Sequence, residues 1–321
     1  MTSPPEHGSQ KPFASSIEQA GGIRVICLGL SALDQFWRVQ RLFTGRSEKI
    51  RGLIYSTSGG GMAANAAVAV SRLGGVCAFW GRAGDDAAGR EMRAALAAER
   101  IDVTNFKLFP NGRSSVSGII VDAFGERQIV NFRGEFPETA EWLPLDEVAD
   151  AAVVLADPRW VDGAAALFTR SRLLGVPTVL DADIADAVVF ERLLPLTDHA
   201  IFSEAALAEF AGDFDNASLE KLGRFGCRVV AVTRGEAGVS WFQDGCAHWQ
   251  AAYDVPVVDT TGAGDVFHGA YAFAIGSGFD VRQAMSFAAA TAALKCRNAG
   301  GRAGIPSIDE CLAFMRMHRC E

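Results

Sequence analysis

Short apolar runs rich in β-branched residues alternate along the chain with longer stretches whose apolar positions recur at helical spacing. Residues 23–30 predict a buried first strand, and residues 62–73 predict the first helix. This alternation favours a mostly parallel sheet covered by helices on both faces, because parallel strands need a crossover between them. Further strands are predicted at 76–80, 153–156, 178–180, 200–202 and 228–232, the last leading into a hairpin, and further helices at 90–99, 164–174, 265–276, 281–295 and 308–318.

Two stretches break this rhythm because polar and apolar residues alternate in them, which is typical of strands with one solvent-facing side. They cover about residues 35–57 and 113–133, and the second contains a turn at 122–126. We expect them to pair as a small sheet that stands off the main body. Residues 1–22 contain three prolines and no apolar run, so we expect a disordered tail followed by one domain over residues 23–321.

Composition and charge argue against several classes of protein. The 321 residues carry a net charge of −8 without a basic cluster, which argues against nucleic acid or an anionic membrane as a partner. No stretch approaches the length of uninterrupted apolar sequence that a membrane span needs. The seven cysteines include no C-x-x-C pair, and the five histidines show no metal-ligand spacing. We therefore expect a cytoplasmic protein with reduced thiols.

The most informative segment is Asp259-Thr-Thr-Gly-Ala-Gly-Asp265, where a short strand enters a small-residue loop and an apolar helix follows. The first N–H groups of such a helix have no internal partner, so the turn can bind an anion. An acid there would repel phosphate, but it is useful if Asp265 takes the proton from an attacking hydroxyl while the N–H groups of residues 262–264 hold the transferred phosphoryl. Spacing alone leaves a second interpretation open, in which Asp265 only caps the helix.

A second glycine turn opens a small-residue helix far upstream, in Gly59-Gly-Gly-Met-Ala-Ala-Asn65. Between the two turns stands Gly81-Arg-Ala-Gly-Asp-Asp-Ala-Ala-Gly89. In this order the segments resemble the signatures of the ribokinase-like (PfkB) family of carbohydrate kinases, and the resemblance extends over residues 23–316. It implies an ATP-dependent sugar kinase with an α/β fold: a three-layer α/β/α body with a mostly parallel central sheet, and a small β-sheet lid formed by the two alternating stretches.

The resemblance also implies roles for individual residues. Asp265 corresponds to the catalytic base of the family. Without the family, Asp34 would be interpreted as a solvated loop acid and Asn65 as a helix-surface amide. By position, the anion hole is expected at Gly262, Ala263 and Gly264, the sugar hydroxyls at Asp34, Gly60, Gly61 and Asn65, and ATP at Thr233, Gly235, Gly238, Gly262 and Gly264.

Cofactors and partners follow from the same resemblance. ATP and Mg²⁺ are expected, since Mg²⁺ neutralises charge on the β- and γ-phosphates. Many relatives carry Asn-x-x-Glu where this chain has Ser203-Glu-Ala-Ala206, so we assign no protein ligand to Mg²⁺. Asp259 and Thr261 resemble a monovalent-cation site in relatives that use K⁺. Relatives often dimerise by clasping their lid sheets, and we expect a homodimer here, with a sugar and ATP as the small-molecule partners.

Within the family, residues 155–160, 180–184, 198–204 and 293–306 resemble the sulfofructose kinase subgroup. This implies phosphoryl transfer from ATP to the C1 hydroxyl of 6-deoxy-6-sulfofructose. Lys49, Asn131 and Arg159 match the positions expected to bind the sulfonate, which offers three acceptor oxygens to a guanidinium, an ammonium and an amide. The alternatives are a kinase for another ketose, sugar phosphate or related carbohydrate (fructose, fructose 6-phosphate, ribose) and a non-catalytic sugar sensor.

Overall fold

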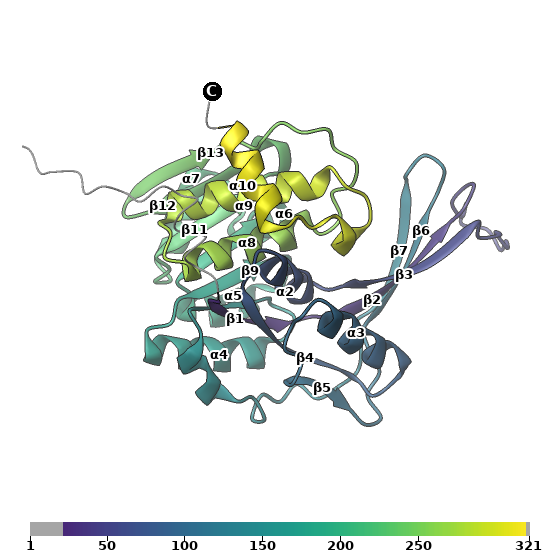
Figure 1. Cartoon of the computed structure of the whole chain (residues 1–321), viewed down its shortest axis with the longest axis horizontal. Helices are drawn as coiled ribbons and strands as arrows, with labels where there is room; N and C mark the ends of the chain where they lie inside the picture. The colour runs from purple at the N-terminus through teal and green to yellow at the C-terminus, as the bar shows by residue number, and fades with distance from the viewer. Residues whose placement is uncertain (1–21, 319–321) are drawn as a thin grey trace, which may run out of the picture.

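The computed structural model describes residues 22–318, and its main body is built on one large sheet (Figure 1). Its strands are β1 (Arg24–Gly29), β4 (Val76–Gly84), β5 (Phe106–Phe109), β8 (Val153–Ala156), β9 (Thr178–Ala182), β10 (His199–Ser203), β11 (Val229–Thr233), β12 (Val239–Gln243) and β13 (Cys246–Gln250). They lie in the order β13-β12-β11-β10-β9-β8-β1-β4-β5. Neighbours are parallel from β11 to β5, and β12 and β13 add an antiparallel hairpin at one edge. The predicted, mostly parallel sheet is therefore confirmed.

Helices cover both faces of this sheet, and β1 shows why. Val25 and Cys27 pack into one apolar cluster, whereas Ile26 and Leu28 pack into the other. Successive strand residues point to opposite faces, so a strand that is apolar throughout needs a cover on each side. The first cluster is covered by α2 (Met62–Arg72), α3 (Ala87–Ala98), α8 (Ala263–Gly276), α9 (Val281–Cys296) and α10 (Ile308–Met317), and the second by α4 (Val161–Leu174), α5 (Ala187–Leu193), α6 (Glu204–Ala211) and α7 (Asn216–Gly223).

Helices α2 and α8 approach each other closely because both carry small residues at their contact. A Cβ on Gly269 would overlap the backbone of Ala66, so a larger residue there would push the helices apart. Asn65 precedes Ala66, and Asp265 lies one turn before Gly269. The close packing therefore brings two polar residues together that are 200 positions apart in the sequence.

The two alternating stretches form a separate sheet that projects from the body, at the right of Figure 1. It contains β2 (Ala32–Arg38), β3 (Ile54–Gly60), β6 (Val116–Val121) and β7 (Arg127–Phe132), in the order β3-β2-β6-β7. Each hairpin is antiparallel, and β2 pairs with β6 in parallel. The predicted small sheet is confirmed, although most of residues 39–53 form a connection rather than strand.

Several local features differ from the sequence prediction. Helix α8 begins at Ala263, two residues earlier than expected, and β5, α5, α6 and α7 were not predicted. The predicted disordered tail lies, except for Gly22, outside the described residues. Between residues 22 and 318, no helix combines the length and the apolar character needed to cross a membrane.

Candidate active site

The start of α8 forms the predicted glycine turn. Gly262 is the N-cap residue, with a φ of 75° that favours glycine, and no side chain caps the helix. Asp265 therefore does not cap this helix, and that alternative is wrong. The N–H of Ala263 donates to the carbonyl of Thr260 at 3.1 Å, whereas the N–H groups of Gly262 and Gly264 meet no acceptor among residues 22–318. Two of the three expected donors are thus free to bind an anion.

Asp265 lies within the first turn of α8 and faces Asn65 of α2. The amide Nδ2 of Asn65 donates to Oδ2 of Asp265 at 2.6 Å. Desolvation raises the pKa of Asp265 to about 6; the Asn65 bond opposes this rise, and the charges of Asp157 and Asp183 add to it. A carboxylate with such a pKa is ionised at neutral pH and is a stronger base than an exposed one.

Arg302 is a site residue that the sequence prediction missed. It lies in the short 3₁₀ helix Gly301–Gly304, its side chain is buried, and its Nε donates to Asn65 Oδ1 at 2.7 Å. A second nitrogen of the guanidinium donates to the carbonyl of Gly60 at 2.8 Å. Arg302 therefore fixes the orientation of the Asn65 amide, so that its NH₂ group points at Asp265. The only local signal was a single arginine in a glycine-rich, otherwise uncharged segment.

Asp34 stands on the projecting sheet, and strand register gives it two polar neighbours. Asp34 pairs with Ser117 on β6, and Ser117 pairs with Asn131 on β7, so the three side chains share one face. Asn131 Nδ2 donates to Ser117 Oγ at 3.2 Å. Burial raises the pKa of Asp34, while the Ser117 hydrogen bond and the charge of Arg302 oppose that rise. The row Asp34–Ser117–Asn131 therefore links Asp34, expected to bind the sugar, to Asn131, expected to bind the sulfonate.

The glycines beside Asp34 are required by close packing. A Cβ on Gly60 would overlap the Asp34 carboxylate, and one on Gly61 would overlap the backbone at Leu30. Gly61 also has a φ of 94°, which an L side chain rarely adopts. Because Gly60 and Gly61 have no side chain, the backbone there can pack directly against Asp34 and Leu30.

Asp157 organises the carboxyl edge of the sheet and was also missed. Its buried carboxylate accepts backbone N–H bonds from Leu30 at 2.7 Å, from Ala63 at 3.1 Å and from Arg159 at 2.9 Å. These three residues follow β1, begin α2 and follow β8. One carboxylate therefore holds three substrate-facing segments in a fixed arrangement.

A cavity of about 500 Å³ lies at this edge, and it contains two of the three residues predicted for the sulfonate. Asn131 and Arg159 line it, as do Arg82 and Arg133. Lys49 lies on the exposed connection between β2 and β3 and does not line this cavity, so its role in anion binding stays a prediction.

The cavity's positive charge is partly neutralised. Arg159 bonds to the Asp183 carboxylate at 3.0 Å and to the carbonyl of Ile184 at 2.6 Å, and Arg82 pairs with Glu138 at 2.7 Å. Arg133, which the prediction did not include, forms no ion pair within the described part of the chain. Its guanidinium is therefore the least neutralised of the three.

A second cavity, of about 440 Å³, adjoins the glycine turn of α8. Thr233, Gly235 and Gly238 line it on one side, and Ala263 and Gly264 on another. Four of the five predicted nucleotide residues thus line one cavity, and the fifth, Gly262, lies next to them at the start of α8. Gly238 has a φ of 85°, and a Cβ there would overlap the carbonyl of Gln250. The remaining walls, including Tyr253, Val255, Phe267, Ala289, Ala292 and Ala293, are largely apolar and fit the flat face of a base.

At the expected K⁺ site, the oxygens of Asp259 accept hydrogen bonds from the protein. Asp259 Oδ1 accepts the N–H of Thr261 at 2.9 Å, and Oδ2 accepts that of Gly300 at 3.0 Å. The ammonium of Lys295 donates to the Asp259 carbonyl at 2.8 Å. Each of these three oxygens therefore already has a protein donor, and one of those donors is an ammonium group.

For Mg²⁺, the structure adds no protein ligand set. Among residues 22–318, no group of three or more His, Cys, Asp or Glu side chains is arranged to hold a metal ion. Ala206 is buried in α6, and Glu204 is exposed at the start of that helix. Mg²⁺ commonly reaches such sites bound to nucleotide phosphates and water, with few protein contacts.

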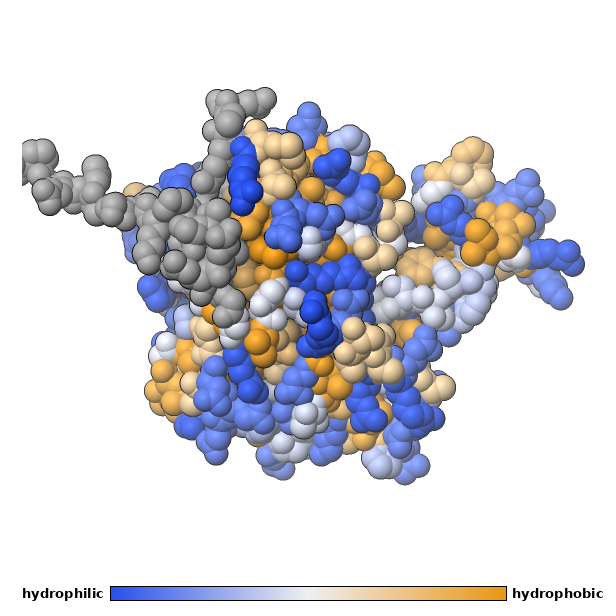
Figure 2. All heavy atoms as spheres, viewed as in Figure 1, coloured by the Kyte–Doolittle hydropathy of each residue, from blue (hydrophilic) through white to orange (hydrophobic). Residues whose placement is uncertain are grey.

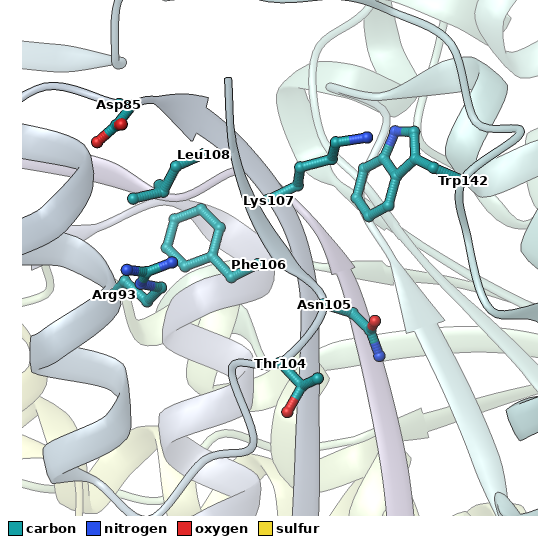
Figure 3. A pocket seen from close by; sticks show the side chains of 8 residues that line it. All are labelled: Asp85, Arg93, Thr104, Asn105, Phe106, Lys107, Leu108 and Trp142. Carbon is teal, nitrogen blue, oxygen red and sulfur yellow. The ribbon is translucent and has the colours of Figure 1, made fainter. Parts of the chain in front are cut away.

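A third cavity, of about 390 Å³, lies beside the edge strand β5 and contains none of the predicted site residues. Figure 3 shows Lys107 extending toward the ring of Trp142, and its ammonium lies 4.8 Å from that ring centre. Arg93 of α3 faces the other side of the strand (Figure 3). This cation–π contact holds Lys107 against the protein and leaves the site described above unaffected.

Comparisons with known proteins agree with this geometry. Residues 23–308 match the family model described as pfkB family carbohydrate kinase. The chain is 34% identical to a fructokinase of Klebsiella pneumoniae over 65% of this chain and 74% of that protein, and 28% identical to a ribokinase of Haemophilus influenzae over 85% and 92%. A crystal structure of a candidate ribokinase from Agrobacterium tumefaciens superposes with a TM-score of 0.88 at 36% identity, covering 94% of this chain and 100% of that one. This chain belongs to the pfkB family of carbohydrate kinases and is a sugar kinase of the ribokinase and fructokinase type.

Proposed function

We propose that this kinase transfers the γ-phosphoryl group of ATP to the C1 hydroxyl of 6-deoxy-6-sulfofructose. The observation that carries the proposal is the row Asp34–Ser117–Asn131, which leads from the sugar-binding position to a cavity that Arg133 and Arg159 line. We expect a ketose held at Asp34 by its hydroxyls to direct its far end along this row. An anionic group at that end then reaches the guanidinium groups.

In the proposed reaction, Asp265 accepts the proton of the C1 hydroxyl as the oxygen attacks the γ-phosphorus. The free N–H groups of Gly262 and Gly264 hold the phosphoryl oxygens during transfer. ATP would lie in the cavity between Thr233 and the start of α8, and Mg²⁺ bound to its phosphates would neutralise their charge. Asn65 keeps Asp265 oriented, and the bond between Asp265 and Asn65 makes the ionised form available at neutral pH.

The balance of charge favours a singly charged substrate end. Of the three arginines around the cavity, Arg82 and Arg159 already face carboxylates, and only Arg133 lacks one among the described residues. A sulfonate carries one negative charge, whereas a phosphate monoester carries about 1.5 to 2 at neutral pH. Glu138, Asp186 and Glu209 also line the cavity, so three carboxylates offset its three guanidinium groups, and a singly charged sulfonate suits it better than a phosphate.

An unmodified ketose is the second candidate, and the pairing of Arg159 favours it. Two of the five guanidinium N–H groups of Arg159 are engaged by Asp183 and Ile184, so fewer donors remain for an anion. The Klebsiella pneumoniae relative is described as a fructokinase, which is consistent with a neutral ketose.

A panel of ADP-release assays separates these candidates. We expect kcat/KM for 6-deoxy-6-sulfofructose to exceed that for fructose, fructose 6-phosphate and ribose by at least about a hundredfold, the factor expected from about two charge-assisted hydrogen bonds. Equal turnover on fructose would overturn the sulfonate proposal and leave the neutral-ketose kinase.

Single substitutions test the anion end directly. Arg159→Met and Arg133→Met should each lower kcat/KM for the sulfonated sugar by roughly ten- to a hundredfold, with little effect on fructose. Arg90→Met is the matched control, because Arg90 is exposed on α3 and pairs with Asp85, and neither residue lines this cavity. Equal losses on both sugars in Arg159→Met would show that Arg159 supports the backbone rather than the anion.

The proposal includes a homodimer formed through the projecting sheet. Figure 2 shows orange patches on the projecting arm. In and just before its outer strands, five large side chains are each more than half exposed: Leu53, Ile54, Tyr55, Ile129 and Val130. A second copy would cover them. Sedimentation analysis of Tyr55→Glu against the wild type tests this, and a wild-type monomer at micromolar concentration would refute it.

A further inference from the structure

Lys295 is a buried lysine near the end of α9, where the surrounding helix positions are small or apolar. Its side chain is completely buried, and its Nζ donates to the Asp259 carbonyl at 2.8 Å and lies 3.7 Å from Asp259 Oδ2. Burial of an ammonium is unfavourable unless its charge is compensated. The buried Lys295 therefore depends on the main-chain carbonyl and the carboxylate of Asp259.

Asp259, the partner of Lys295, lies next to the anion-binding turn. Asp259 begins the loop that leads to the anion-binding turn at Gly262–Gly264, and its carboxylate holds the N–H groups of Thr261 and Gly300. The N–H groups of Val258 and Asp259 also donate to the carbonyl of Cys296, next to Lys295, at 2.8 and 3.1 Å. The end of α9 therefore fixes the backbone from which the turn starts.

A second cation approaches the same carboxylate from the projecting sheet. Arg127, the first residue of β7, lies 3.7 Å from Asp259 Oδ1 and donates to the hydroxyl of Thr261 at 2.9 Å. Two positive side chains thus face one carboxylate. A further monovalent cation would be repelled by both and would find the oxygens already bonded.

We propose that the Lys295 ammonium is a built-in replacement for the monovalent cation, so that the phosphoryl-binding turn forms without K⁺. An ammonium group and a potassium ion carry the same single charge and attract the same carbonyl and carboxylate oxygens. Lys295 is therefore a positioning residue: it acts on the reaction through Asp259 and the turn, and it lines neither of the two cavities assigned to sugar and ATP. The inference rests on the proposed kinase chemistry for its catalytic consequence, but its structural consequence is independent of the substrate.

The first test compares the wild-type protein in potassium and in tetramethylammonium buffers of equal ionic strength, about 100 mM. We expect the kinase rate to differ by less than about twofold between the two buffers. The melting temperature should differ by no more than about 2 °C. Activation of the wild type by K⁺ of about tenfold or more, or a clear K⁺-dependent rise in its melting temperature, would overturn the proposal.

The second test removes the ammonium. Lys295→Met should lower the melting temperature by roughly 5 °C, because Asp259 loses its buried counter-charge, and K⁺ or NH₄⁺ should restore much of that loss. Lys221→Met is the matched control, because Lys221 is an exposed lysine in the last turn of α7. If Lys295→Met does not fold, the wild-type comparison still decides the question.

Melting curves also separate this inference from the proposed substrate. If no tested sugar is phosphorylated, the kinase proposal fails, while cation-insensitive melting of the wild type and cation rescue of Lys295→Met still support the role of Lys295. If Lys295→Met melts as the wild type does, or its loss is not reversed by either cation, the replacement role is refuted even when sugar turnover is intact.

Discussion

Replacement of Arg302 by methionine should shift the pH at which the kinase loses activity. Arg302 reaches Asp265 through Asn65, by hydrogen bonds of 2.7 and 2.6 Å on either side of one amide group. The guanidinium charge therefore lies about 6 Å from the carboxylate, where one charge is worth roughly 3 kcal/mol at an effective dielectric constant of about 20. Methionine retains the apolar volume of the side chain and removes this charge.

The sign of the effect follows from the role of the carboxylate. A base must be ionised to accept a proton, and a positive neighbour favours the ionised form, so loss of Arg302 raises the pKa of Asp265. An interaction of about 3 kcal/mol corresponds to about two pKa units, and water entering the vacated space reduces this to about 1.5. The pKa of Asp265, about 6 in the wild type, therefore rises in the variant. The ionised fraction at pH 7, about nine-tenths in the wild type, therefore falls.

The assay is kcat/KM measured from pH 5 to pH 9. We expect the acid limb of the profile to move upward by about 1.5 pH units in Arg302→Met, with partial recovery of activity at pH 9. Arg302→Lys is the matched control, because it keeps the charge and loses the planar guanidinium; its acid limb should stay near that of the wild type. An unshifted acid limb in a folded Arg302→Met protein would refute the electrostatic role of Arg302.

Two further substitutions test the base and the nucleotide turn. Asp265→Asn keeps the size of the side chain and removes the base, so kcat should fall by about 10²–10⁴ in the ADP-release assay; activity close to that of the wild type would favour a non-catalytic sugar sensor. Gly238→Ala should lower the stability to thermal unfolding by about 2–3 kcal/mol and raise the KM for ATP, because its φ is 85° and its Cβ would overlap Gln250. Gly226→Ala is its control, since Gly226 has a φ of 99° but open space around its Cβ; an equal loss in both would contradict the overlap argument.

Local pattern was enough to predict most of the framework. Strands such as β1 and β11 are buried on both faces, so their apolar runs are continuous and easy to recognise. Helices α6 and α7 were missed although capping signals were present: Ser203 and Asp215 each accept the N–H of the residue three positions later. The connection at residues 39–53 could not be distinguished from strand by alternation, because strand identity there depends on finding a partner.

The sequence indicated only those candidate site residues that lie within a recognisable family motif. The family resemblance indicated Asp265, Asn65 and the glycine turn, but it did not indicate Arg302, whose partner Asn65 lies 237 positions away. Lys295 was predicted only as the last residue of the helix at 281–295, and its importance depends on a loop 36 residues earlier in the chain. Contacts of this kind arise from helix packing and from the order of the strands, which single segments do not specify.

Asp157 has a consequence for how the specificity of such an enzyme can change. Because one carboxylate anchors the ends of β1 and β8 and the start of α2, these three backbone segments move together or not at all. Side chains at the rim, such as Asn131 and Arg133, are free of that anchor. Redesign toward a new sugar can therefore proceed by exchanging rim side chains one at a time while the backbone beneath them stays a constant platform.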